Sequence, residues 1–225
     1  MRLPAALSRE CCNPSLGMSS RILPKLYLLT DRHQTLNRPL SSVITEAVDA
    51  GVRMVQIREK DLKTRDLASL CHQLFPLIKH HHGTILLNDR IDLVLALGAD
   101  GVHLRTNSLP VSVARRLLGT GHLIGVSTHS VEEARVAEAE GADFIVLGPI
   151  FDTPSKRAYG PPLGIQILQE TSRSLHLPIY AIGGITPIRI PDVLSSGAYG
   201  VAVISSILQS PSIPDITREL LARLS

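Results

Sequence analysis

The stretch Ile182-Gly183-Gly184-Ile185-Thr186 follows a short apolar run and is read together with a second stretch, Val201-Ala202-Val203-Ile204-Ser205-Ser206. Glycines at a strand end have no Cβ, so backbone N–H groups there can approach a ligand closely. The two serines precede a segment that could begin a helix, whose N-terminus favours an anion. Each stretch alone is equally well read as a tight turn or a helix N-cap. Together they indicate a phosphate site, because the loops after strands seven and eight hold phosphate in many β/α barrels.

Upstream of these stretches, aliphatic runs alternate with segments of helical spacing. Continuous aliphatic runs are typical of strands that are buried on both faces of a parallel sheet. We expect strands at residues 26–30, 52–57, 84–87, 101–104, 123–126, 144–147, near 179 and at 201–204. We expect helices at 40–50, 64–79, 91–97, 110–118, 131–140, 163–174, 188–195 and one that ends at 224. Strand followed by helix eight times predicts an α/β fold, a (β/α)8 TIM barrel formed as a single domain by residues 24–225.

An open doubly wound sheet is the alternative fold, but the sequence contains no G-x-G-x-x-G fingerprint and no break between two halves. Four glycines, Gly51, Gly98, Gly141 and Gly197, recur just before expected strands. This repetition of one helix–turn–strand unit favours the barrel.

Composition narrows the classes of partner. The chain has 225 residues, 44% hydrophobic, 19% charged and only 3% aromatic, which predicts one domain with an aliphatic core. The scarcity of rings and the net charge of +3 without a Lys/Arg run argue against nucleic acid as a partner. No apolar run reaches the roughly 18 residues that a membrane span needs, so we expect no membrane partner either.

Three further features are given no functional role. Residues 1–23 are expected to form a poorly ordered leader, too weakly apolar for a signal peptide. Cys11, Cys12 and Cys71 make an odd count without metal-type spacing, so we expect no disulfide framework and a cytoplasmic location. The run His80-His81-His82 is read as a solvated helix end, because three adjacent side chains cannot all face one ion.

In a TIM barrel the active site lies at the C-terminal strand ends, so the residues that follow each strand are the candidates. After the second strand, Gln56, Arg58 and Lys60 alternate toward one side. Two cations and an amide that converge there indicate an anionic ligand. The other interpretation is a strand end whose cations pair with Glu59 and Asp61.

The next strand ends carry further candidates. Asn88 and Asp89 follow the third strand and can hold Mg²⁺ through one carboxylate plus substrate oxygens, or can cap the next helix. Ser127 and His129 follow the fifth strand. His129 lies at a strand end, where it could transfer a proton, although a loop histidine without a role is an equal interpretation.

The loop after the sixth strand carries Thr153, Ser155 and Lys156, whose hydroxyls and ammonium group would form an oxyanion cradle. The loop is long enough to act as a lid. Taken together, the strand ends offer many anion ligands and at most one or two metal carboxylates. They show no Ser/His/Asp triad and no cysteine nucleophile.

Five segments, in order and one at each of five strand ends, together resemble the thiamine-phosphate synthase/TenI family over nearly all of residues 25–208. The segments are Val55-Gln56-Ile57-Arg58-Glu59-Lys60, Leu87-Asn88-Asp89-Arg90, Gly125-Val126-Ser127-Thr128-His129, Gly148-Pro149-Ile150-Phe151 with Thr153-Pro154-Ser155-Lys156, and Ile182-Gly183-Gly184-Ile185-Thr186. The resemblance implies a TIM barrel with a thiazole phosphate held by Gly184 and by the backbone of Ile204 and Ser205. It implies that Ser127, Thr153, Ser155 and Lys156 border the same site.

In the synthase branch the resemblance implies that Gln56, Arg58, Lys60 and Asn88 hold the diphosphate of hydroxymethylpyrimidine diphosphate, and that Asp89 binds Mg²⁺. Condensation with hydroxyethylthiazole phosphate would release pyrophosphate. Arg58 and Lys156 would act by electrostatic stabilisation of the leaving group. The ligands expected are therefore small phosphorylated heterocycles, and association into a homo-oligomer is left open.

The resemblance breaks after the fourth strand. The synthase pattern there is similar to Gly-Gln-x-Asp, whose Asp is a second Mg²⁺ ligand, but the matching residues are Arg105, Thr106, Asn107 and Ser108. Ser108 cannot supply the charge. Ser108-Leu109-Pro110 is more similar to the TenI branch, which implies a thiazole tautomerase that uses His129. A non-catalytic sensor of thiazole phosphate or thiamine phosphate is a third hypothesis, but the retained cations favour the synthase.

Overall fold

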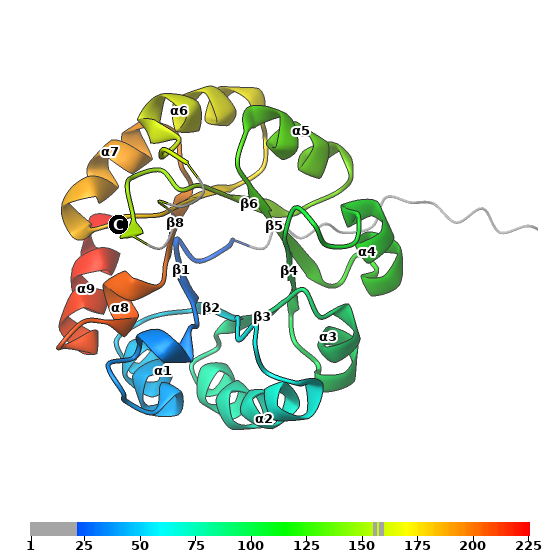
Figure 1. The fold of residues 1–225 in the computed structure, drawn as a ribbon, viewed down its shortest axis with the longest axis vertical. Coiled ribbons are helices and arrows are strands. Elements are labelled where there is room, and N and C mark those ends of the chain that lie inside the picture. The colour runs from blue at the N-terminus through cyan, green and yellow to red at the C-terminus, as the bar shows by residue number, and fades with distance from the viewer. Residues whose placement is uncertain (1–21, 155–156, 158–159) are drawn as a thin grey trace, which may run out of the picture.

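The structure is a computed structural model that describes residues 22–154, 157 and 160–225. Eight strands pair in parallel in sequence order, and the last strand pairs with the first, so the sheet closes into a barrel. The helices form a ring around it (Figure 1). The predicted (β/α)8 barrel is confirmed.

All strands of the barrel are short and buried. They are β1 (Leu26–Leu29), β2 (Met54–Ile57), β3 (Thr84–Asn88), β4 (Gly101–Leu104), β5 (Leu123–Thr128), β6 (Phe144–Leu147), β7 (Ile179–Ile182) and β8 (Gly200–Val203). Because neighbouring strands run the same way, their C-terminal ends meet at one end of the barrel, which we call the mouth.

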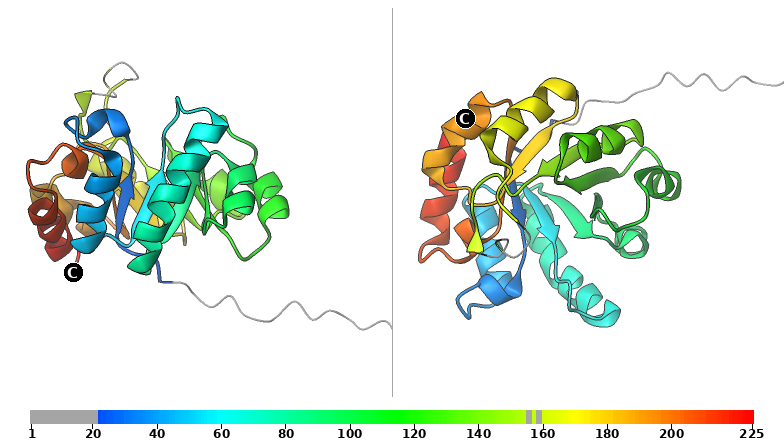
Figure 2. Two further views of the ribbon diagram at one scale, coloured as in Figure 1. Left: turned by 90° about the horizontal axis from the view of Figure 1, so that it is seen from below. Right: turned by 45° about the horizontal axis from the view of Figure 1, so that its top comes forward.

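The helices pack against the outer face of the strands, as the two views in Figure 2 show. They are α1 (Leu40–Asp49), α2 (Thr64–His80), α3 (Ile91–Leu97), α4 (Val111–Leu118), α5 (Val131–Ala139), α6 (Gly164–Ser174), α7 (Ile190–Ser195), α8 (Ser205–Leu208) and α9 (Ile213–Arg223). Two single-turn 3-10 helices, η1 (Arg32–Gln34) and η3 (Pro187–Arg189), follow β1 and β7.

Many element boundaries differ from the sequence-based ones by one or two residues, and three differences matter here. Helix α2 continues through Pro76 to His80, one residue beyond the expected end. Strand β5 extends to Thr128, two residues beyond the expected end, which carries Ser127 into the sheet. The closing helical segment is divided into α8 and α9, because the chain turns at residues 209–212.

The core has two layers of different composition. Between strands and helices it is aliphatic, with side chains such as Val43, Ile44, Ile57 and Ile85 that are at most 1% exposed. Burial of each such side chain contributes about 1.5–3 kcal/mol. The barrel interior is different, and the expectation of a purely aliphatic core is wrong there.

Three aromatic rings, Tyr27, Phe144 and Tyr180, fill the barrel interior together with Met54 and Leu86. Their ring centroids lie 5.4–5.7 Å apart in edge-to-face arrangements, which are the favoured geometry for aromatic pairs. Few rings are present in the chain, but strand alternation directs these three into one place. The interior is therefore a packed core and not a channel.

The end of the barrel opposite the mouth is closed by the chain that leads into β1. Tyr180 Oη donates to the Pro24 carbonyl oxygen at 2.7 Å, and Tyr199 Oη donates to the Leu23 carbonyl oxygen. The expected leader overlaps these closing residues at its C-terminal end; its first 21 residues lie outside the described part of the chain. Among the described residues, no helix is both long and apolar enough to cross a membrane.

Candidate functional site

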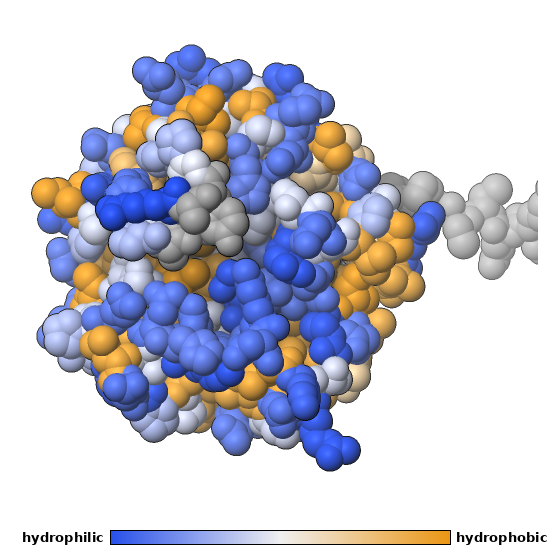
Figure 3. Space-filling view, in the orientation of Figure 1, coloured by the Kyte–Doolittle hydropathy of each residue, from blue (hydrophilic) through white to orange (hydrophobic). Residues whose placement is uncertain are grey.

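Polar side chains collect at the mouth, where Figure 3 shows a broad hydrophilic surface. This surface contains two cavities. The first lies above β5–β8 and is also bordered by Arg58, and the second lies above β2–β4.

The backbone after β7 forms a concave turn that requires glycine. Gly183 and Gly184 have φ angles of 98° and 63°, in the left-handed region. A Cβ on Gly184 would lie 2.8 Å from the Asp152 carbonyl oxygen, and one on Gly183 would lie 2.6 Å from Pro149 Cβ. Both glycines line the cavity, so their backbone N–H groups are available to a ligand that enters it.

The end of β8 forms the opposite wall of the cavity. Ile204, Ser205 and Ser206 line it, and Ser206 Oγ donates to the Ile185 carbonyl oxygen at 2.5 Å. This hydrogen bond fixes the β8 end to the β7 loop. On the other side, Arg189 Nη1 donates to the Gly184 carbonyl oxygen at 2.6 Å, which orients the Gly184 peptide. Residues of the two sequence stretches that predicted a phosphate site therefore line one cavity.

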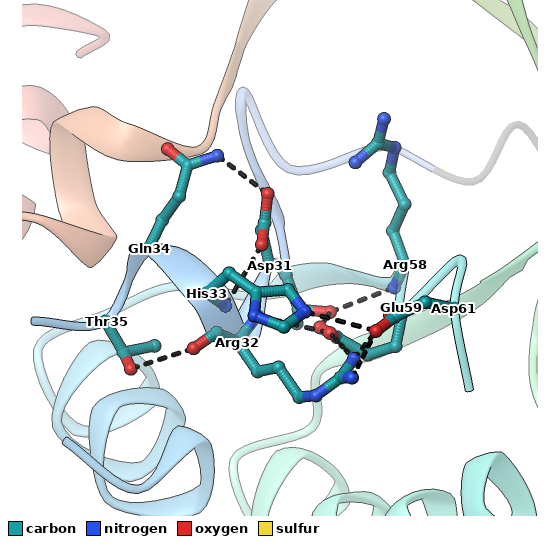
Figure 4. Close-up of polar contacts among 9 residues, drawn as sticks. Asp31, Arg32, His33, Gln34, Thr35, Arg58, Glu59 and Asp61 are labelled. Carbon is teal, nitrogen blue, oxygen red and sulfur yellow. Dashed lines mark hydrogen bonds and ion pairs between the residues drawn. The ribbon is translucent and has the colours of Figure 1, made fainter. Parts of the chain in front are cut away.

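Glu59, which the sequence offered as an ion-pair partner for the cations that follow the second strand, pairs with Arg32 instead and holds the strand ends of β1 and β2 together (Figure 4). Its side chain is 1% exposed and accepts from Thr30 Oγ1 at 2.6 Å, from the Arg32 amide at 3.1 Å and from Arg32 Nη1 at 3.1 Å. Thr30 Oγ1 in turn accepts from the Arg58 amide at 2.9 Å. The surface pair between Arg32 and Asp61 extends the same cluster.

Arg58 rises from this support into the mouth, as Figure 4 shows. Its guanidinium makes no hydrogen bond or ion pair with any residue that the structure describes, although it is partly buried. Burial lowers the pKa of Arg58, the carboxylates of Asp31 and Glu59 oppose that shift, and the charge of Arg105 adds to it. A cation in this position is stabilised by an anionic ligand.

Below Arg58 a polar chain crosses the barrel interior. Gln56 Nε2 donates to Tyr27 Oη at 3.1 Å, Tyr27 Oη lies 3.4 Å from His103 Nδ1, and His103 Nε2 lies 2.8 Å from Ser127 Oγ. Gln56 is fully buried, and its Oε1 has no hydrogen-bond partner among the described residues. Burial, with a smaller contribution from Arg58, lowers the pKa of His103 to about 3, so this imidazole is neutral at physiological pH.

The second cavity holds Lys60, Asn88 and Asp89, as the sequence predicted for these strand ends, together with Arg105. Asp89 has a φ of 59°, and its amide donates to the His103 carbonyl oxygen at 2.9 Å. Its carboxylate accepts from Arg105 Nη2 at 2.6 Å. Arg105 was not predicted as a site residue. The sequence signal that could have identified it is its place in the segment after β4, where the chain differs from the synthase pattern.

His129 borders the first cavity with Ser127. Its amide donates to Glu133 Oε2 at 2.7 Å, and its Nδ1 lies 3.3 Å from the same oxygen. Ser130 Oγ accepts from the Glu133 amide at 3.1 Å and so caps the start of α5, while the Glu133 carboxylate binds the amide of His129. The helix cap thus also fixes the imidazole at the cavity wall.

The structure brings most of the predicted site residues to one mouth. The cavity above β5–β8 is lined by Arg58, Ser127, His129, Thr153, Gly184, Ile204 and Ser205. Gln56 lies beneath it in the barrel interior. Ser155 and Lys156 lie outside the described residues, so their predicted roles stay predictions.

Comparison with known proteins agrees with this geometry. The family described as thiamine monophosphate synthase matches residues 26–207. The chain belongs to this family. It is 50% identical over 199 residues, 88% of this chain and 93% of the other, to a putative thiamine-phosphate synthase of Geobacter sulfurreducens. It is 39% identical to a thiamine-phosphate synthase of Roseiflexus over 87% of this chain and 83% of the other.

Among solved structures, thiamine phosphate pyrophosphorylase from Pyrococcus furiosus superposes on this thiamine monophosphate synthase family member with a TM-score of 0.81. The two are 32% identical, and the match covers 89% of this chain and 95% of the other. A 3-hexulose-6-phosphate synthase matches at a TM-score of 0.68 but at 17% identity, which shows the shared barrel alone. The expected family and fold are both confirmed.

The family resemblance implies a bound magnesium ion, which would need free carboxylate oxygens near Asp89. The Asp89 carboxylate is already paired with Arg105, and Ser108 Oγ accepts from the Arg105 amide at 2.8 Å. Within the described ranges, no group of three or more His, Cys, Asp or Glu residues could hold a metal ion. Because Mg²⁺ favours free carboxylates together with water and phosphate oxygens, these residues do not fit a magnesium ion held by two carboxylates.

Proposed function

We propose that the protein is a thiamine-phosphate synthase, a transferase that joins hydroxymethylpyrimidine diphosphate to hydroxyethylthiazole phosphate and releases pyrophosphate. The main support is that a phosphate cradle and a cluster of cations open on the same mouth. The cradle suits the monophosphate of a thiazole, and the cations suit a diphosphate. Relatives named for this activity are 39% and 38% identical over 87% of the chain.

The proposed reaction requires stabilisation of the charge on the leaving pyrophosphate and orientation of the two substrates. The bond between the pyrimidine methylene carbon and the diphosphate oxygen breaks, and its electron pair leaves with pyrophosphate. The methylene cation then accepts the lone pair of the thiazole nitrogen, which forms the new C–N bond. Arg58 and Lys60 would stabilise the charge on the departing oxygen, while Gly184 and Ser205 would hold the thiazole phosphate so that its nitrogen faces the carbon.

Ser127 would contact the heterocycles between these two anion sites. Its hydroxyl is held by the neutral imidazole of His103 at 2.8 Å, which fixes its direction. A neutral histidine beneath the site adds no positive charge next to the methylene cation. The buried polar chain would therefore orient the reactants without opposing the charge that forms between them.

A coupled assay tests the proposal. Purified protein is supplied with both substrates and Mg²⁺, and thiamine phosphate and pyrophosphate are measured together. We expect equal amounts of both products, and a loss of about 100-fold or more in rate for Arg58→Ala, because a charge-stabilising group of this kind contributes several kcal/mol. Arg218→Ala is the matched control, since Arg218 is an exposed cation of α9 that pairs with Asp215. Absence of both products would reject the synthase.

One observation favours a second candidate, the TenI-like thiazole tautomerase. His129 borders the cradle and is oriented by Glu133, as a residue that transfers a proton to a bound thiazole would be. The two candidates separate with His129→Ala. A synthase would keep most of its condensation rate, whereas a tautomerase would lose its activity on the thiazole carboxylate phosphate tautomer.

Two further expectations stay predictions. Neither the cytoplasmic location nor a homo-oligomeric state is tested by the fold. Gel filtration with light scattering would give the oligomeric state directly, and a fluorescent fusion would give the location.

A further inference from the structure

We propose that Arg105 binds the substrate's diphosphate directly and, through its ion pair with Asp89, takes the place of a magnesium ion held by the protein. The proposal rests on the proposed function, because it assigns the diphosphate to the cavity above β2–β4. It explains why the second carboxylate of the synthase pattern is absent here: a guanidinium supplies the positive charge that the metal would otherwise supply.

The segment after β4 is folded so that Arg105 turns toward β3. Its amide donates to Ser108 Oγ at 2.8 Å, and the Ser108 amide donates to the Arg105 carbonyl oxygen at 3.0 Å. Ser108 is thereby committed to closing this turn. At the same time β3 and β4 pair with Asn88 opposite His103, which brings Asp89 beside Arg105.

The guanidinium is fixed at one edge and open at another. Nη2 donates to Asp89 Oδ2 at 2.6 Å, and the guanidinium makes no other hydrogen bond with the residues that the structure describes. The Arg105 side chain is 37% exposed and lines the cavity, so its remaining exposed N–H groups can donate to an anion that enters there. The planar guanidinium presents several donors in a geometry that suits phosphate oxygens.

The charges around Arg105 favour an anion. Arg105 and Lys60 line the same cavity, and Arg58 lies close enough for the charge of Arg105 to lower its pKa. Asp89 offsets one of these three cations, and the Asp31 carboxylate opposes the lowering of the Arg58 pKa. The buried carboxylate of Glu59 is occupied by Thr30 and Arg32. Like charges that are gathered in a partly buried site are stabilised by a multivalent anion, and a diphosphate has the required charge.

Calorimetry with inorganic pyrophosphate in EDTA tests the contact without metal and without turnover. We expect the wild type to bind and Arg105→Gln to bind at least about tenfold more weakly, because a charge-assisted pair is lost. Arg218→Gln is the matched control. Arg218 is a cation of α9 that pairs with Asp215 and lines neither cavity, so its loss should change affinity less than twofold.

Equal affinity of Arg105→Gln and wild type would overturn the proposal, and so would no binding of pyrophosphate to the wild type in EDTA. Thermal melts confirm that each variant is folded. If Arg105→Gln does not fold, Arg105→Lys serves instead, since it keeps the charge but loses the planar donors. We expect that variant to bind pyrophosphate more weakly than the wild type, and unchanged binding would count against Arg105.

Metal binding is read separately by electron paramagnetic resonance of Mn²⁺ with the ligand-free protein. We expect the wild type to leave added Mn²⁺ free in solution, because Asp89 is paired. The double variant Arg105→Gly/Ser108→Asp should bind Mn²⁺, and Asp89→Asn added to it should abolish that binding. Mn²⁺ held by the wild type and released by Asp89→Asn would overturn the proposal.

The pyrophosphate-binding experiment and the condensation assay can succeed or fail independently of each other. If the wild type binds pyrophosphate through Arg105 but forms no thiamine phosphate, the proposed function fails while the diphosphate site stands. If thiamine phosphate forms but Arg105→Gln binds pyrophosphate normally, the function stands and this inference fails.

Discussion

His103 Nε2 lies 2.8 Å from Ser127 Oγ, and this contact joins the buried core of the barrel to the cavity at its mouth. The imidazole is 2% exposed and lies among the rings of Tyr27 and Phe144. A histidine in such surroundings is kept neutral, so it acts as a fixed hydrogen-bond partner and not as an acid or base in the physiological range.

The lowered pKa of His103 predicts how stability depends on pH. Its pKa falls from 6.5 to about 3 on folding, so below pH 6.5 the unfolded chain binds a proton that the folded protein excludes. The free energy of unfolding should therefore be fully retained above pH 6.5 and fall as the pH drops toward 3, by about 1.4 kcal/mol per pH unit. Urea unfolding at pH 7 and pH 5 measures this.

His103→Gln provides the comparison for that measurement, because it keeps a polar side chain without a titrating ring. We expect the wild type to lose about 2 kcal/mol more than the variant between pH 7 and pH 5. Parallel pH dependences for the two proteins would show that His103 does not resist protonation.

Gly184→Ala should impair phosphate binding, because the added Cβ would lie 2.8 Å from the Asp152 carbonyl oxygen at a φ of 63°. Gly98→Ala is the matched control: its φ is 72°, but no atom lies within 4 Å of the added Cβ. Both should lose about 1–2 kcal/mol of stability from the left-handed backbone. Only Gly184→Ala should raise the KM for the thiazole phosphate, and an equal KM in both variants would contradict the cradle.

Glu59→Gln should destabilise the protein by about 3 kcal/mol, because the buried carboxylate accepts three hydrogen bonds and an amide cannot replace all of them. It should also raise the KM for the diphosphate substrate, since Glu59 and Thr30 fix the start of Arg58. Asp61→Asn removes the exposed partner of Arg32, which Glu59 also binds, and should change little. Equal melting temperatures for the two variants would show that the buried carboxylate of Glu59 contributes no more to stability than the exposed carboxylate of Asp61.

Cys71 should resist alkylation in the folded protein. Its thiol is buried in α2, and burial raises its pKa to about 11, so the reactive thiolate is scarce at pH 8. Mass spectrometry of peptides after iodoacetamide treatment resolves this cysteine from Cys11 and Cys12. We expect labelling of Cys71 only when urea is added, and rapid labelling without urea would show that the helix opens locally.

The barrel was predictable because its signals are local. A buried strand such as Phe144–Leu147 can be recognised from its continuous aliphatic run. A helix such as Ile91–Leu97 can be recognised from its hydrophobic spacing and from the glycine that ends it. Strand order then places every strand end at one mouth, which is why Arg58 and Gly184 could be assigned to one site from the sequence. The aromatic interior was not predictable from composition, since alternation along separate strands brings those rings together.

The pairing of Arg105 with Asp89 depends on register, which no local pattern encodes. Both residues directly follow their strands, so a shift of β4 against β3 by one residue would displace Arg105 from Asp89. For the same reason the hold of Glu59 on the β1 loop was not visible, because its partners Thr30 and Arg32 follow another strand. The sequence showed which groups are present at the strand ends, and the register decides which of them touch.

The chain at Leu23 and Pro24 closes one end of the barrel and the three rings fill its interior, so the described part of the chain contains no channel through the barrel. Both cavities open at the other end, so a ligand of either one binds and leaves at the same face. For the proposed synthase, we expect the joined product to occupy space that both substrates need and therefore to compete with each of them.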